Sequence, residues 1–106
     1  MRDFDYAAFD ELLQSRVRLA IVAFLASAGE ADFTQVRDST KTTDGNASVH
    51  LRKLEDAGYV AVEKRFVARK PQTLYALTPR GRAALLDHVA RLESLLRPPG
   101  AKPRGG

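Results

Sequence analysis

The sequence predicts an α+β fold that is mostly helical, with a β-hairpin in its second half. Two observations predict it. A segment with helical apolar spacing, residues 44–57, ends at a glycine, and two β-rich segments, residues 59–66 and 72–77, follow it around a basic loop. The 106 residues suffice for one modest core and are too few for two. We expect one domain over residues 1–96 and a flexible, basic tail rich in proline and glycine over 97–106.

The first half of the chain is predicted to be helical. Apolar residues at helical spacing predict a helix over residues 4–13 and a second over 16–28, which Ser15 caps and which is buried on most sides. A linker or short strand at residues 30–33 then precedes a short helix over 34–39. At the other end of the chain, Thr-Pro at positions 78 and 79 starts a last helix that continues to Leu96.

The helix over residues 44–57 carries the clearest functional pattern. Thr43 is a good N-cap, and Asp44 lies in the first turn, where capping and solubility outweigh cytosine recognition as its role. An inward face is expected for Ala47, His50, Leu51 and Leu54, and we expect His50 to be a packed, hydrogen-bonded residue. The opposite face then presents Gly45, Asn46, Ser48, Val49, Arg52 and Lys53.

Small and amide side chains near the start of this helix suit contact with DNA bases. Asn46 has the amide geometry for adenine N6 and N7, and Ser48 can donate to a base or a phosphate. Two interpretations of a glycine at position 45 are equally favoured: it lets the helix backbone approach DNA closely, or the helix is loose at its N-terminus. Further along, Arg52 and Lys53 suit phosphate contact as well as guanine recognition.

The predicted hairpin is strongly basic. Lys64, Arg65, Arg69 and Lys70 lie within seven residues. Such a cluster keeps an edge strand soluble, or it grips phosphate and places an arginine in the minor groove. A major-groove helix beside a cationic hairpin is the layout of a winged helix-turn-helix. The predicted DNA-contacting residues are Thr43, Asp44, Gly45, Asn46, Ser48, Val49, Arg52, Lys53, Lys64, Arg65, Arg69, Lys70 and Gln72.

The charge distribution agrees with this prediction. Residues 1–60 hold 7 basic and 10 acidic residues, a net charge of −3, whereas residues 61–106 hold 10 basic and 3 acidic residues, a net charge of +7. A concentration of positive charge favours a polyanionic partner, because cations that displace counterions supply much of the affinity for nucleic acid. A solvated basic face is the alternative interpretation of the composition alone.

Other classes of function are disfavoured. The chain has no cysteine, and its two histidines are about 38 positions apart, so we expect no disulfide, metal or cofactor site. A glycine-rich phosphate loop and a Ser/His/Asp arrangement are absent, so we expect no enzyme. No apolar run has the length needed to cross a bilayer, and the first residues do not resemble a secretory signal, so we expect a cytoplasmic protein with no membrane partner.

Three segments together resemble the MarR/ArsR-like winged-helix transcriptional regulators, in particular their compact stand-alone branch of winged helix DNA-binding domain proteins. They are SRVRLAIVAFL, TDGNASVHLRKLEDAGYVAVEK and TLYALTPRGRAAL, and the resemblance covers about residues 8–96. It implies a regulator of transcription, with repression the expected mode, that binds near-palindromic double-stranded DNA as a homodimer. In such relatives the terminal helices form the dimer, here residues 4–13 and 79–96.

The chain also departs from these relatives. The cysteine and histidine sets of ArsR-type metal sensors are missing, and the terminal helices are shorter than those that enclose an effector pocket in larger MarR proteins. A small-molecule effector is left open, with no residue pointing to one. The alternative function is a winged-helix module that binds proteins without reading DNA. That function requires exposed apolar residues on the helix over 44–57, where only Val49 qualifies.

Overall fold

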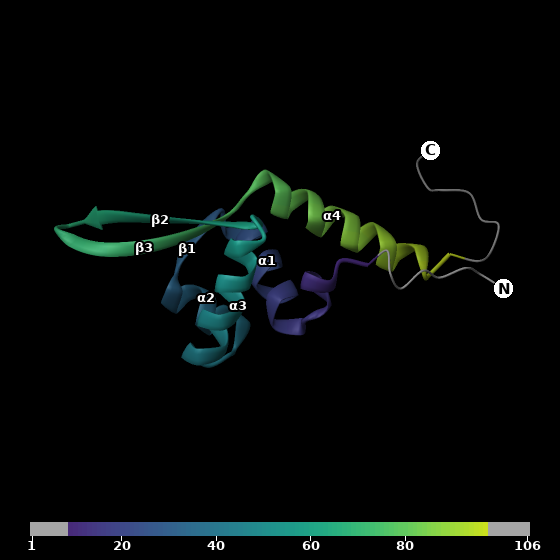
Figure 1. The fold of residues 1–106 in the computed structure, drawn as a ribbon, viewed down its shortest axis with the longest axis horizontal. Coiled ribbons are helices and arrows are strands. Elements are labelled where there is room, and N and C mark those ends of the chain that lie inside the picture. The colour runs from purple at the N-terminus through teal and green to yellow at the C-terminus, as the bar shows by residue number, and fades with distance from the viewer. Residues whose placement is uncertain (1–8, 98–106) are drawn as a thin grey trace.

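The computed structural model describes residues 9–97, and its elements follow the order expected for a winged helix (Figure 1). A short 3-10 helix comes first, four α-helices and three strands follow, and the hairpin extends away from the helices. The elements are η2 (Glu11–Gln14), α1 (Arg16–Ala28), β1 (Glu30–Asp32), α2 (Phe33–Thr40), α3 (Asp44–Asp56), β2 (Val60–Val67), β3 (Lys70–Leu77) and α4 (Pro79–Ser94).

Polar caps fix where each helix begins. The Ser15 hydroxyl accepts a hydrogen bond from the Arg18 amide at the start of α1. At the start of α2, Asp32 and Gln35 form a reciprocal capping box, in which each side chain accepts from the other residue's amide. Helix α1 ends at Gly29, whose φ of 85° favours glycine.

The three strands form one antiparallel sheet in the order β1-β3-β2. Strands β2 and β3 pair along their whole length, from Val60 opposite Leu77 to Val67 opposite Lys70. The two residues between them, Ala68 and Arg69, both have positive φ, as the tight turns of two-residue hairpins require. Neither is a glycine or an asparagine. This hairpin is called the wing below.

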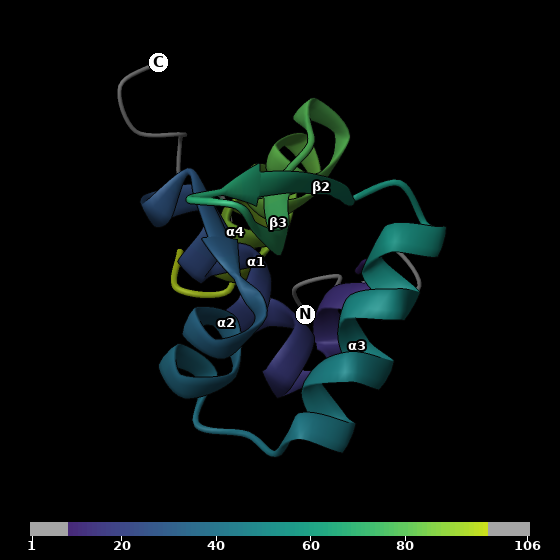
Figure 2. The same cartoon turned by 90° about the vertical axis from the view of Figure 1, so that its left-hand side faces the viewer.

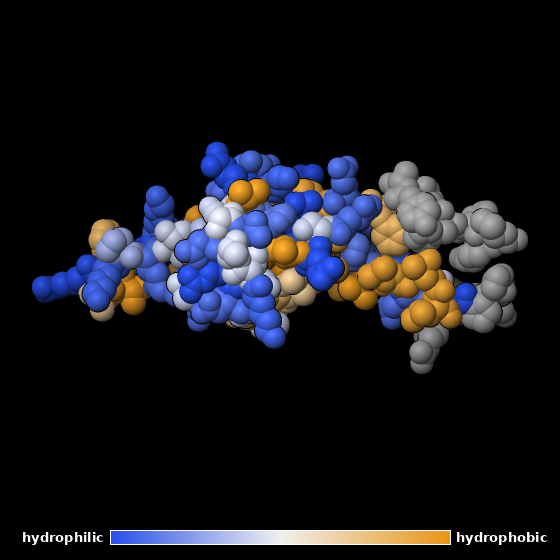
Figure 3. Space-filling model, turned by 90° about the horizontal axis from the view of Figure 1, so that it is seen from below, coloured by the Kyte–Doolittle hydropathy of each residue, from blue (hydrophilic) through white to orange (hydrophobic). Residues whose placement is uncertain are grey.

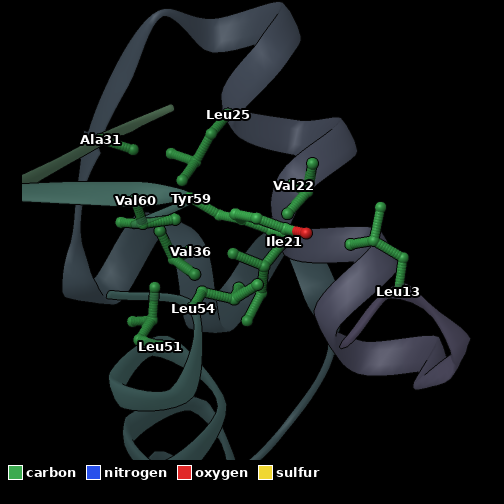
Figure 4. Packing of buried hydrophobic residues seen from close by; sticks show 10 residues of the cluster. All are labelled: Leu13, Ile21, Val22, Leu25, Ala31, Val36, Leu51, Leu54, Tyr59 and Val60. Atoms are coloured by element: carbon green, nitrogen blue, oxygen red, sulfur yellow. The ribbon is translucent and has the colours of Figure 1, made fainter. Parts of the chain in front are cut away.

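One hydrophobic core lies between the helices and the base of the sheet (Figure 4). Its buried residues are Leu13, Ile21, Val22, Leu25, Ala31, Val36, Leu51, Leu54, Tyr59 and Val60. The Tyr59 hydroxyl donates to the carboxylate of Asp10, which joins the start of the wing to the N-terminal segment. Burial and this hydrogen bond raise the pKa of Tyr59 to about 12.

Helix α4 contacts the core through Ala84 and Leu85, and His88 further along it is also buried. Thr78 caps it by accepting from the Gly81 amide, and its own hydroxyl donates to the Gly58 carbonyl. Gly81 is buried so close to the Tyr59 backbone that a Cβ atom there would collide with the Tyr59 carbonyl. The rest of α4 extends to the opposite end of the molecule from the wing (Figure 1).

The structure corrects the expected N-terminal helix and several boundaries. Of the helix predicted over residues 4–13, positions 4–8 lie outside the described residues, and the remainder holds only the 3-10 turn of η2. It is short because Asp10 caps it and Ser15 already has the extended backbone that precedes α1. Both wing strands are shifted or longer than predicted, since cross-strand pairing continues to the turn. Of the predicted tail, residues 98–106 lie outside the described part.

Candidate DNA-binding interface

Helix α3 is held at its start by two side chains. The Thr43 hydroxyl accepts from the Asn46 amide at 3.2 Å, which confirms the predicted N-cap. The carboxylate of Asp44 accepts from the Arg37 guanidinium of α2 at 2.7 Å, and hydrogen bonds to Asp44 and Asp38 raise the pKa of Arg37. This ion pair links the two helices of the helix-turn-helix, so Asp44 has a structural partner that the sequence did not reveal.

The predicted outward face of α3 is confirmed. Ala47, Leu51 and Leu54 are buried against the core. The exposed residues include Thr43, Asp44, Gly45, Asn46, Ser48, Val49, Arg52 and Lys53. Val49 is 54% exposed and is the one large hydrophobic residue exposed on this helix, which is described along its whole length. An open surface of small, amide and basic side chains can meet base edges and phosphates.

His50 lies at the flank of α3 that faces α1. Its Nδ1 is 3.0 Å from the Arg18 guanidinium, whose Nε donates to the Leu12 carbonyl at 2.7 Å. Because a guanidinium only donates, His50 must accept through an unprotonated Nδ1. Burial lowers the pKa of His50, and the charges of Arg18 and Lys53 lower it further. The prediction of a packed, hydrogen-bonded histidine is therefore confirmed.

The opposite flank of α3 faces the wing. Ser48, Arg52 and Glu55 line a small hollow together with Tyr75 of β3. Burial raises the pKa of Tyr75, and the nearby charge of Glu55 raises it further. In Figure 2 the C-terminal end of α3 lies next to the start of β2, and the helix runs away from the sheet. Tyr75 therefore marks the face of the sheet that lies against α3.

The pairing of β2 with β3 assigns each wing residue to one of two faces. Side chains of directly opposed residues point to the same face, and the face alternates along each strand. Because Tyr75 faces α3, the other members of that face are Val62, Lys64, Phe66, Pro71 and Thr73. The far face holds Glu63, Arg65, Val67, Lys70, Gln72 and Leu74.

Arg65 forms ion pairs on the far face of the wing. Its guanidinium lies 2.8 Å from Glu63 of the same strand and 2.8 Å from Glu30 of β1. Hydrogen bonds to these two carboxylates raise its pKa. Lys64, Arg69 and Lys70 form no ion pair within residues 9–97. Lys64, Arg69 and Lys70 can therefore pair with an external anion, whereas Arg65 already has acidic partners within the domain.

Two residues outside the predicted DNA-contacting set also lie on the α3 side of the wing. Thr73 lies opposite Lys64, and Phe66, which is 78% exposed, lies opposite Pro71. The alternation of side chains along residues 72–77, which puts Thr73, Tyr75 and Leu77 on one face and Gln72 on the other, can be read from the sequence. An aromatic residue in a strand is ordinary, so no signal in the sequence marked Phe66.

A second surface lies at the other end of the molecule, where α4 passes η2 and α1. An open apolar hollow of about 440 Å³ is lined by Phe9, Leu13, Gln14, Arg16, Leu19, His88, Leu92 and Leu95. His88 is buried and packs edge-on against Phe9, with ring centroids 5.7 Å apart, and its Nδ1 has no hydrogen-bond partner among residues 9–97. Hydrophobic side chains gather at this end of the surface (Figure 3).

Among residues 9–97, no group of three or more acidic, histidine or cysteine residues is arranged to hold a metal ion. Within the same range, none of the helices is both long enough and apolar enough to cross a membrane.

The helix-turn-helix of α2 and α3 beside an antiparallel wing defines a winged-helix protein. Comparison of sequences gives the family: residues 17–96 match the model of the winged helix DNA-binding domain family, and the chain belongs to it. An uncharacterized protein of Methanocaldococcus jannaschii is 29% identical over 85 residues, which are 80% of this chain and 92% of that protein.

Comparison with solved structures agrees with this family. A transcriptional regulator homologue from Pyrococcus horikoshii is 30% identical and superposes with a TM-score of 0.76 over 82% of this chain and 86% of its own. BpsR of Bordetella bronchiseptica, whose DNA binding is regulated by 6-hydroxynicotinic acid, is 19% identical with a TM-score of 0.70 over 92% of this chain and 75% of its own. A MarR family regulator from Silicibacter pomeroyi, 20% identical, has a TM-score of 0.68 and covers 81% and 56%.

Proposed function

We propose that this protein is a transcriptional regulator that binds duplex DNA with α3 in a major groove and the wing on the neighbouring backbone and minor groove. The observation that carries the proposal is the open polar face of α3 beside a wing whose cations have no acidic partner in the described residues: Lys64 on the α3-facing side, and Arg69 and Lys70 at the tip. Cations without an acidic partner are free to displace the counterions of DNA.

The proposed contacts divide into two kinds. Asn46 and Ser48, near the start of α3, supply recognition of base edges, and Gly45 leaves open space around the backbone beside them. Phosphate contacts come from Arg52, Lys53 and the three wing cations. Arg65 is left out of the proposed interface because it already pairs with Glu30 and Glu63, and Gln72 because it lies opposite Arg65 on the far face. Lys70 shares that face but lies next to the turn and has no acidic partner in the described residues.

We propose further that the protein acts as a homodimer through the α4 end. Leu92 and Leu95 line the apolar hollow, and Leu86 and Val89 of α4 and Leu96 after it are further exposed hydrophobic residues. Exposed apolar side chains gathered at one end of a small domain are typical of an interface. A second copy that covers this surface leaves both copies of α3 free, as binding to a two-fold symmetric site requires.

Selection of bound duplexes from a random pool, followed by mass determination of the complex, tests the proposal. We expect an enriched, near-palindromic sequence and a mass of two chains per duplex. Retention of no duplex above a scrambled control, at low salt, would contradict the DNA-binding proposal.

Two variants with equal exposure test the dimer separately. Leu95, the C-cap residue of α4, and Val67 on the wing are each 48% exposed. We expect Leu95→Glu to give a monomer in sedimentation and Val67→Glu to keep the dimer. A dimer that survives Leu95→Glu would place the interface elsewhere.

A further inference from the structure

Phe66 has no role in the folded domain that explains its position. Its side chain is 78% exposed near the tip of the wing, and it lies outside the core cluster. Across the strands it faces only Pro71, the second residue after the turn. An aromatic ring left in water at the end of a hairpin contributes little to stability and invites aggregation.

Phe66 lies on the side of the wing that the proposed interface uses. It shares the α3-facing side of the hairpin with Lys64 and Thr73, as the pairing of β2 with β3 shows. Figure 1 shows the wing extending beyond α2 and α3. The ring is therefore carried out past the helices on the same face as Tyr75, which lies beside Ser48 and Arg52 of α3.

Cations lie before and after Phe66 along the hairpin. Lys64 lies two residues before it on the same face, and Arg69 and Lys70 follow at the turn, all three without an ion pair in the described part of the chain. Hydrophobic side chains appear among hydrophilic ones at the wing end in Figure 3. Cations that grip phosphates on either side of an apolar ring are the arrangement with which proteins insert a wedge between base pairs from the minor groove.

We infer that Phe66 is an apolar wedge that enters the minor groove next to the major-groove segment held by α3, unstacks a base step and bends the duplex. This inference rests on the proposed function. It implies a preference for a pyrimidine–purine step under the wing, because such steps unstack at the lowest cost. Sequence preference would then extend beyond the bases that α3 contacts.

The test uses the full chain and the duplex enriched by selection. Donor and acceptor dyes at the two ends report bending, and 2-aminopurine at successive steps under the wing reports unstacking. We expect the natural protein to raise energy transfer and 2-aminopurine fluorescence. Phe66→Ser should lose both signals and bind about 10-fold more weakly, whereas Phe66→Leu should retain most of each.

Val67→Ser is the matched control, because Val67 is the neighbouring exposed hydrophobic residue on the far face. It should bind and bend DNA like the natural protein. Equal binding and bending by Phe66→Ser would overturn the wedge, and so would natural complexes that show neither bending nor unstacking. In both cases DNA binding itself stands. Absence of duplex binding by the natural protein would instead overturn the proposed function.

Discussion

The guanidinium of Arg18 on α1 lies 3.0 Å from Nδ1 of His50 on α3, so a fixed cation directly faces a titratable base at the flank of the candidate recognition helix. The contact exists only while Nδ1 is unprotonated. Arg18 also donates to the Leu12 carbonyl, and it therefore joins α3 to both η2 and α1.

The free energy of unfolding should fall at acidic pH because of the protonation of His50. Burial and the charges of Arg18 and Lys53 lower the pKa of His50 below its ordinary 6.5, so the unfolded chain takes up the proton first as pH falls. The stabilisation is complete above pH 6.5 and is lost as pH falls through the lower pKa of the folded state. We expect denaturant unfolding of His50→Gln to show a flatter decline from pH 7 to 5 than the natural protein shows. Identical pH profiles would contradict this assignment.

Gly81→Ala should destabilise the domain by about 1–3 kcal/mol, as overpacking does. The new methyl group would collide with the Tyr59 carbonyl and lie 2.7 Å from Cδ1 of Leu77. Urea unfolding measures the loss. A free energy of unfolding equal to that of the natural protein would show that α4 can shift to admit the methyl group.

Gly45→Ala is the contrasting change, because nothing lies within 4 Å of a Cβ atom at that position. The fold should gain up to about 1 kcal/mol from helix propensity. If the α3 backbone approaches the bases closely, affinity for the selected duplex should nevertheless fall about 10-fold, a loss of roughly 1.4 kcal/mol. Undiminished affinity in the anisotropy titration would leave looseness at the helix start as the reason for the glycine.

Binding to duplex DNA should weaken steeply with salt, and the wing should account for part of the slope. Arg69→Ala and Lys70→Ala should each reduce the slope of log affinity against log salt by about one unit, because each variant leaves one phosphate without its cation. Arg82→Ala on the exposed side of α4 removes the same charge away from the interface and serves as the control. A slope unchanged by the wing variants would remove the wing from the interface.

Asn46→Ala should lose discrimination between the selected and a scrambled duplex by about 1–3 kcal/mol, while nonspecific binding stays nearly intact. The Thr43 cap bonds to the Asn46 backbone amide, so the substitution leaves that hydrogen bond in place. Competition titrations with both duplexes measure the difference. An equal loss on both duplexes would make Asn46 a backbone contact.

The sequence predicted those parts of the fold that local patterns determine. The apolar stripe through Leu51 and Leu54 identified α3 and its outward face, and Thr43 identified where the helix starts. Local pattern failed at residues 9–13, where the sequence predicts part of a helix but the structure has only the start of the 3-10 helix η2, between the caps Asp10 and Ser15. In that segment the caps Asp10 and Ser15, and not the apolar periodicity, determine the length of the helix.

The division of the wing into two faces depends on contacts between distant segments. Arg65 is an unremarkable member of a basic cluster until β1 brings Glu30, 35 residues earlier, within 2.8 Å of it. Charge clustering alone could not distinguish Arg65 from Lys64. The hairpin register and the position of Tyr75 against α3 make the distinction.

The turn at the wing tip has a consequence for engineering. Positive φ at Ala68 and Arg69 costs roughly 1–2 kcal/mol per residue relative to glycine. An Asn-Gly pair at these positions would relieve that strain and give a more stable hairpin, but it would remove Arg69 from the turn. The stability of the domain and its affinity for DNA therefore place opposite demands on positions 68 and 69. A library that varies only these two residues would measure how far one property is lost as the other is gained.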